Sequence, residues 1–97
     1  MIIVHDIFIC KPGNASKFAK LFKEIMVDNT DLVNIMTDMT GDFNKVVMVT
    51  KYDSLTAYEK SFEKYMHDTD EMKKMKEKMK GYTDMYLTGS REIYQVQ

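Results

Sequence analysis

The amino-acid sequence predicts an α+β fold in which helices cover one face of a four-stranded antiparallel sheet. Two observations predict it. Short runs rich in β-branched residues alternate with segments whose apolar residues recur every three or four positions. Turn-forming residues separate these segments, and the resulting order is strand, helix, strand, strand, helices, strand. This order is the split βαβ, ferredoxin-like pattern, and right-handed crossovers then place both helical regions on the same face of the sheet.

The first third of the chain predicts a strand, a tight turn and an amphipathic helix. Residues 2–10 are β-branched and aromatic, and this run stops at the turn-forming residues 11–13. Asn14 is a suitable N-cap for the helix that follows. Its apolar residues lie on one stripe, and we expect the helix to end near residues 28–30.

Two further strand-like runs, residues 32–39 and 45–52, are joined by a short loop of turn formers. This arrangement predicts an antiparallel hairpin. The C-terminal residues, from about Met85 to Gln97, are also strand-like and supply the fourth strand.

The region between the hairpin and the last strand predicts two helical segments. Thr56 and Glu59 have the spacing of a capping box, which predicts a helix start. The inner stripe of this helix is expected to be Leu55, Tyr58, Phe62, Tyr65 and Met66. The periodicity then lapses, and Asp68 with Glu71 resembles a second start, so we expect a break and a shorter helix followed by Gly81 at its C′ position. The stripe of the shorter helix consists of Met72, Met75 and Met79.

Length and composition indicate a single domain, residues 1–97, with one modest core. Fourteen basic and fifteen acidic side chains give a net charge of −1, which argues against non-specific electrostatic binding to nucleic acid or anionic lipid. The lone Cys10 excludes an internal disulfide, and no Cys/His set has the spacing of a zinc site. No stretch resembles a signal peptide or a membrane span, so a cytoplasmic location is expected.

The predicted sheet is apolar on both faces, although the helices are expected to pack on only one of them. Neighbouring apolar residues such as Val46 and Val47 point to opposite faces. The second face needs a cover, because a monomer rarely leaves so large an apolar patch exposed to water. A second copy packed sheet to sheet with two-fold symmetry is the simplest cover, so we expect a homodimer through the sheet face. The alternative is that loops or the C-terminal tail cover it.

The strand order, the length, the broken second helix LTAYEKSFEKYMHDTDEMKKMKEKM and the closing strand SREIYQVQ resemble the dimeric α/β-barrel superfamily. That superfamily includes the antibiotic-biosynthesis-monooxygenase-like and NIPSNAP-like groups. The resemblance covers nearly the whole chain and is one of pattern, without a diagnostic motif. It implies a homodimer whose two sheets form a barrel, with a pocket between sheet and helices in each subunit.

The resemblance also implies a range of activities. Members include cofactor-free oxygenases acting on aromatic polyketides, haem-degrading enzymes and isomerases. The haem-degrading branch uses an Asn, a Trp and a His around the tetrapyrrole. This chain has no Trp, which disfavours haem binding.

Three polar residues are candidates for catalysis. His5 and Asp6 interrupt the apolar first strand and, as neighbours, point to opposite faces. A buried His or Asp has a shifted pKa and can serve as a base, whereas the alternative is a satisfied structural group. His67 can contact a ligand at a pocket mouth beside Tyr65 or Tyr58, and the alternative is a surface histidine stabilised by a helix dipole.

Six tyrosines and ten methionines are many for this length. Methionine adapts to flat or irregular ligands, and aromatic residues line small-molecule cavities. The candidate substrate-binding residues are Tyr52, Tyr58, Phe62 and Tyr65. The alternative is that the methionines are simply core.

Two functions therefore fit the sequence. The first is a small cofactor-independent monooxygenase-like enzyme that holds a flat, largely apolar molecule and needs neither a metal nor a bound organic cofactor. In that enzyme His5, Asp6, His67 and a tyrosine place or deprotonate the substrate. The second is a non-catalytic module, either a small-ligand binder or a dimerising interaction protein, in which these polar residues are structural.

Overall fold

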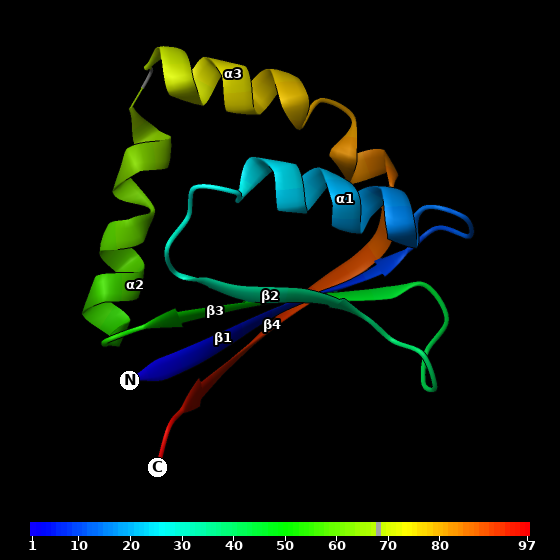
Figure 1. Cartoon of the computed structure of the whole chain (residues 1–97), viewed down its shortest axis with the longest axis horizontal. Helices are drawn as coiled ribbons and strands as arrows, with labels where there is room; N and C mark the ends of the chain where they lie inside the picture. Colours follow the sequence, from blue (N-terminus) through cyan, green and yellow to red (C-terminus); the bar gives the residue numbers. More distant parts are fainter. Residues whose placement is uncertain (68) are drawn as a thin grey trace.

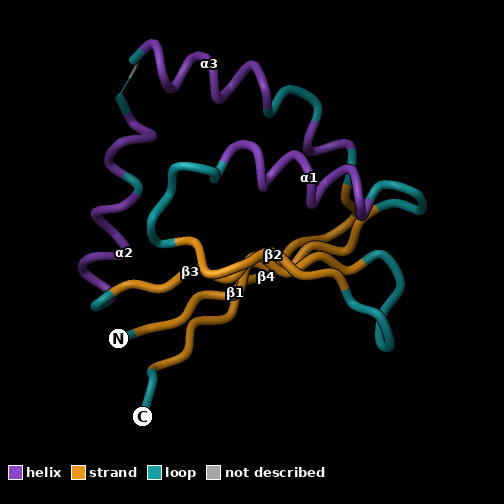
Figure 2. Tube along the Cα trace, in the orientation of Figure 1, coloured by secondary structure: helices purple, strands orange, loops and turns teal. Residues whose placement is uncertain are grey.

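The computed structural model describes residues 1–67 and 69–97, and for residues 64 and 65 it describes the backbone alone. Its antiparallel sheet has the strand order β2-β3-β1-β4. The described helices lie on one face of this sheet, as Figure 1 and the trace in Figure 2 show. The predicted α+β, ferredoxin-like fold is therefore confirmed. The strands are β1 (Ile2–Cys10), β2 (Leu32–Thr37), β3 (Lys45–Tyr52) and β4 (Tyr86–Gln95).

The turn between β1 and the first helix depends on a glycine. Gly13 has a φ of +83°, a left-handed backbone that side chains with a Cβ rarely adopt. Helix α1, Ala15–Ile25, follows the predicted N-cap Asn14, whose side chain makes no capping hydrogen bond. It ends at Ile25, before the predicted end near residues 28–30, and the chain then turns: the Asn29 amide donates to the Met26 carbonyl at 2.9 Å, and the Asn29 side chain accepts a hydrogen bond from the Asp31 amide at 2.8 Å.

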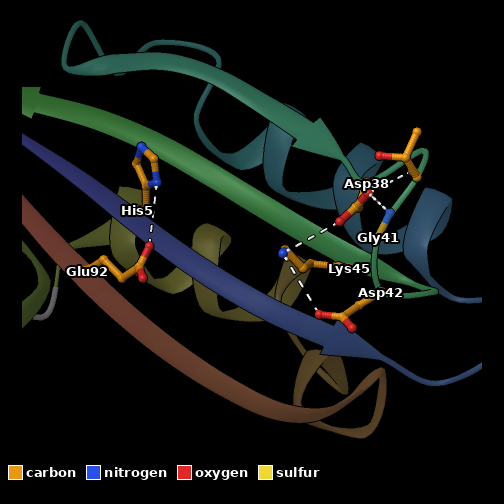
Figure 3. A network of polar contacts seen from close by, with 7 residues as sticks. His5, Asp38, Gly41, Asp42, Lys45 and Glu92 are labelled. Carbon is orange, nitrogen blue, oxygen red and sulfur yellow. Dashed lines mark hydrogen bonds and ion pairs between the residues drawn. The ribbon is translucent and has the colours of Figure 1, made fainter.

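The β2–β3 hairpin is held at its tip by Asp38. Its Oδ1 accepts hydrogen bonds from the backbone amides of Thr40 and Gly41, at 2.8 and 2.6 Å. Lys45 Nζ lies 3.5 Å from the same carboxylate (Figure 3). These interactions hold the pKa of Asp38 below its ordinary value, with the two backbone hydrogen bonds as the main cause. The side-chain turn also explains why β2 stops at Thr37, before the predicted boundary at residue 39.

The second helical region is broken, as predicted, but its first helix starts elsewhere. The segments are helix α2 (Leu55–Ser61), the 3-10 turn η1 (Glu63–Met66), helix α3 (Asp70–Lys78) and the 3-10 turn η2 (Tyr82–Asp84). The Ser54 hydroxyl caps α2 by accepting a hydrogen bond from the Ala57 amide at 3.1 Å. The predicted capping box of Thr56 and Glu59 is therefore wrong, because Ser54 already satisfies an amide of the first turn.

The start of α3 is capped in the same way. The Thr69 hydroxyl accepts a hydrogen bond from the Met72 amide at 3.2 Å. Asp68, which was expected to start this helix, lies outside the described residues, and Glu71 lies in its first turn. Gly81 has a left-handed φ of +84° and lies between α3 and η2, just beyond the predicted C′ position.

The core under the helices has two parts. The larger cluster, beneath α1, consists of Cys10, Phe18, Phe22 and Val46. The smaller one, beside α2, consists of Ile2, Val4 and Tyr58. Among the described side chains of the inner stripe predicted for α2, Tyr58 is buried, whereas Leu55 and Met66 are 58% and 83% exposed. The reason is that α2 rises away from the sheet and α3 crosses above α1 (Figure 1), so most of α2 has no sheet beneath it.

Among the described residues, no helix is both long and apolar enough to cross a membrane.

Candidate functional site

A cavity of about 530 Å³ lies between the sheet and the helices. Strands β1, β3 and β4 supply its floor, and α2, α3 and the end of α1 supply its walls. Cavities of roughly 300–1,000 Å³ with mainly apolar linings are typical of small-molecule sites. The lining is rich in aromatic residues and methionines, among them Phe22, Met48, Tyr52, Tyr58, Phe62 and Met75.

One ion pair crosses the floor of the cavity. Asp6 and Arg91 are directly opposite each other on β1 and β4, and Arg91 Nε donates a hydrogen bond to Asp6 Oδ1 at 2.5 Å. Asp6 is buried, whereas half of the Arg91 side chain is exposed. The hydrogen bond to Asp6 raises the pKa of Arg91, so the guanidinium remains charged.

Tyr58 brings a hydroxyl from α2 toward this pair. Its oxygen is buried and makes no hydrogen bond of regular geometry with the described residues. Burial is the main cause that raises the pKa of Tyr58, while the charge of Arg91 lowers it. The guanidinium carbon of Arg91 lies 5.8 Å from the centre of the Tyr58 ring and 5.9 Å from that of Phe62, which is cation–π distance. A charged group, a neutral phenol and apolar walls therefore meet in one cavity.

The predicted substrate-binding residues gather at this cavity. Tyr52, Tyr58 and Phe62 line it, and the side chain of Tyr65 lies outside the described part of the structure. The predicted methionine stripe, Met72, Met75 and Met79, contributes to the walls. That these residues bind a substrate stays a prediction.

The three candidate catalytic residues lie in three different places. Asp6 faces the cavity. His5 points to the opposite face of the sheet, with its Nδ1 3.9 Å from Glu92 Oε1 (Figure 3) and its ring edge-on to Tyr94. His67 is exposed and lines a separate hollow of about 280 Å³ between the end of α1 and the start of α3. Within one chain, only Asp6 can act on a molecule in the cavity.

Sequence reasoning missed two basic residues that line the cavity, Arg91 and Lys76. Arg91 is the only arginine of the chain and interrupts the last strand, as Asp6 interrupts the first. Two charged residues in apolar strands predict an ion pair only when the register between β1 and β4 is known to place them opposite each other. Lys76 belongs to a lysine-rich run, which is typical of a solvated helix face.

A metal site and a reactive thiol each have structural requirements that can be compared with the described residues. No group of three or more His, Cys, Asp or Glu side chains lies close enough together there to hold a metal ion. Cys10 is buried under α1, and this burial raises the pKa of its thiol. A buried thiol of this kind is unreactive.

The face of the sheet away from the helices is apolar and uncovered among the described residues. Figure 3 looks onto this face, with the helices behind the sheet. We call it the open face and define its apolar part as Ile3, Ile7, Ile9, Met36, Val47 and Tyr94. All of these side chains are partly or largely exposed. The prediction that the sheet is apolar on both faces is confirmed.

Comparisons with known proteins agree with this architecture. The model of the NIPSNAP family matches residues 7–85. An uncharacterised NIPSNAP domain protein from Burkholderia xenovorans has a TM-score of 0.79 at 14% identity, with 100% of this chain and 95% of that chain covered. A NIPSNAP family protein from Agrobacterium tumefaciens has a TM-score of 0.81 at 15% identity, with 99% and 92% covered.

A second group of solved structures shares the fold. An antibiotic biosynthesis monooxygenase has a TM-score of 0.66 at 12% identity, with 100% of this chain and 99% of that chain covered. At such low identity the similarity establishes the fold alone. Among curated protein sequences, none matches this chain.

Proposed function

The chain belongs to the NIPSNAP family, and we propose that it is a homodimer that binds one small, flat, largely apolar molecule in the cavity of each subunit. The cavity is the observation that carries this proposal. The cavity is open to solvent, so its apolar and aromatic lining faces water in the absence of a ligand. A ligand with an apolar body that fills the space removes this lining from water, which favours binding.

The homodimer is supported by the open face. Six apolar side chains are gathered on one side of a sheet whose other side is already covered by helices. An isologous contact between two such faces removes both patches from water at once. The polar residues between them, His5 and Glu92, are close enough to pair and lie within the same surface.

Native mass spectrometry of freshly purified protein tests both parts of the proposal. We expect the mass of two chains together with a small adduct. A bare monomer would contradict the dimer. A dimer without an adduct leaves the ligand to a direct binding measurement.

A fluorescent reporter provides that measurement. The chain has no Trp, so Phe62→Trp places a single indole in the cavity lining. Phe43→Trp is the matched control, because Phe43 is exposed at the hairpin tip. With biphenylmethanol as the probe, we expect a saturable change in emission for Phe62→Trp and none for Phe43→Trp. Equal responses, or no response from either, would contradict a ligand site in the cavity.

Catalysis is a second candidate function, and the position of Asp6 supports it. Cofactor-independent oxygenation needs a base that removes a proton from the substrate, and Asp6 is the one carboxylate among the described residues of the lining. With anthrone as the probe, we expect oxygen uptake above the protein-free rate, lost in Asp6→Asn and retained in His67→Gln. Uptake at the protein-free rate would leave binding as the function.

A further inference from the structure

The cavity carries a local excess of positive charge. Its described lining includes one acidic and two basic side chains, Asp6, Lys76 and Arg91. The formal charge of this lining is therefore +1, whereas the whole chain has a net charge of −1. The excess is a property of the cavity rather than of the overall composition.

The ion pair with Asp6 leaves Arg91 able to bind a second anion. A guanidinium has five N–H donors, and Asp6 takes the one on Nε. The Tyr58 hydroxyl interacts with the same guanidinium, and donors on the terminal nitrogens still remain. Asp6 and the rings of Tyr58 and Phe62 also hold the guanidinium in place, so little side-chain entropy is lost when a ligand binds.

The arrangement of charges favours one anionic group on an apolar body. Arg91 reaches the cavity from the sheet, and Lys76 reaches it from α3. The planar guanidinium matches the geometry of a carboxylate, and charge-assisted hydrogen bonds of this kind are the strong ones. The remaining lining is largely aromatic or thioether, which suits the uncharged part of such a molecule.

We propose that the ligand of this cavity is a monoanionic carboxylic acid with a flat apolar body, whose carboxylate is bound by Arg91 and attracted by Lys76. This inference rests on the proposed function and specifies the ligand class of the same site. Asp6 acts here as a positioning residue, because it fixes the guanidinium through Nε. Tyr58 contributes its ring, which packs beside the guanidinium at cation–π distance.

Two probes of the same shape test the inference. The Phe62→Trp protein is titrated with biphenylacetate and with biphenylacetamide, which differ in charge and share the apolar body. We expect the acid to bind at least about tenfold more tightly than the amide, the effect of one hydrogen-bonded charge. We also expect this preference to decrease as salt is added.

Substitutions on α3 locate the source of the preference. Lys76→Gln should reduce the acid-to-amide preference about threefold, the effect of one partly solvated charge. Lys74→Gln is the matched control, because Lys74 lies on the same helix and outside the cavity lining. It should leave the preference unchanged. Equal effects of the two substitutions would show that the general charge of α3, rather than the cavity, attracts the acid, and would overturn the inference.

The role of Arg91 is tested with a variant in which removing Arg91 does not leave the charge of Asp6 unpaired. Arg91→Gln leaves Asp6 buried without its partner, so the double substitution Asp6→Asn with Arg91→Gln is used beside it. The double variant keeps Lys76, so we expect the preference for the acid to fall to about threefold, the share assigned to Lys76, once the charge-assisted hydrogen bond to Arg91 is gone.

The outcomes separate the two proposals. Binding of both probes with no preference for the acid overturns the carboxylate inference and leaves the ligand cavity standing. A preference that is undiminished in the double variant overturns the role of Arg91. Failure of both probes and of biphenylmethanol overturns the proposed function and this inference with it.

Discussion

Two cross-strand pairs, each of one acidic and one basic residue, lie on neighbouring rungs of the β1–β4 ladder, one on each face of the sheet. Asp6 and Arg91 meet on the face covered by helices, and His5 and Glu92 meet on the open face. The closest nitrogen and oxygen atoms are 2.5 Å apart in the first pair and 3.9 Å apart in the second. The Asp6 side chain is 12% exposed, whereas those of His5 and Glu92 are 31% and 47% exposed.

The two pairs differ because helices cover one face of the sheet, and this burial matters more than the residue types for the energy of a charged pair. Beneath the helices a carboxylate must be paired, because its desolvation is costly. On the open face water and salt screen the charges, and a pair contributes little. A second copy on that face would place His5 and Glu92 under the same constraint as the covered pair.

The largest effect on stability is expected from breaking the covered pair. Arg91→Gln leaves Asp6 buried and unpaired, and we expect it to lower the free energy of unfolding by about 2–3 kcal/mol, less than for a fully buried pair because Arg91 is half exposed. Asp6→Asn combined with Arg91→Gln should cost clearly less. Urea denaturation measures both, and a double variant as unstable as the single one would show that charge burial is not the cause.

The next effect tests whether the open face is an interface. Ile7→Lys places a charge in the middle of the apolar part of that face. We expect dimer affinity to fall by about thirtyfold, or about 2 kcal/mol, because the charge must be desolvated. Sedimentation measures the affinity, and Val27→Lys is the control, since Val27 is exposed at the end of α1. An unchanged dimer in Ile7→Lys would place the interface elsewhere.

A smaller effect is expected from the histidines. In the monomeric Ile7→Lys background, His5→Gln should change the free energy of unfolding by less than about 0.5 kcal/mol, as for other exposed pairs. In the dimer the loss should be larger, because Glu92 would then lose its partner within the interface. Neither His5→Gln nor His67→Gln should alter ligand binding, since both residues lie outside the cavity lining. Lost binding in a stably folded variant would extend the site to that histidine.

The smallest effect concerns the hairpin tip beside the open face. The backbone hydrogen bonds from Gly41 and Thr40 lower the pKa of Asp38 in the folded chain. Its contribution to stability is therefore present above the pKa of the unfolded chain and is lost as the pH falls through the lower folded value. In acid denaturation series we expect Asp38→Asn to be less stable near neutral pH and to lose less stability on acidification. If the free energy of unfolding changed with pH in the same way in both proteins, Asp38 would not be a source of the pH dependence.

Local patterns in the chain were enough to predict much of the fold. Strands β1 and β3 have the predicted bounds, and the alternation along them correctly assigns Ile7 to one face and Phe8 to the other. The break before α3 and the hairpin also follow from neighbouring residues. The helix cap at Ser54 was missed because two hydroxyl residues competed for the same first turn, and only the backbone conformation distinguishes them.

The order of the elements, the two apolar faces of the sheet and the opposite directions of His5 and Asp6 follow from the amino-acid sequence alone. They depend on side-chain periods of two residues in strands and 3.6 residues in helices, which are local properties of the chain. That Asp6 meets Arg91, 85 residues away, and that Lys76 and Tyr58 share a cavity with them is visible in the folded structure alone. The reason is physical: the register between β1 and β4 and the tilt of α2 and α3 depend on packing between distant segments, which no local pattern encodes.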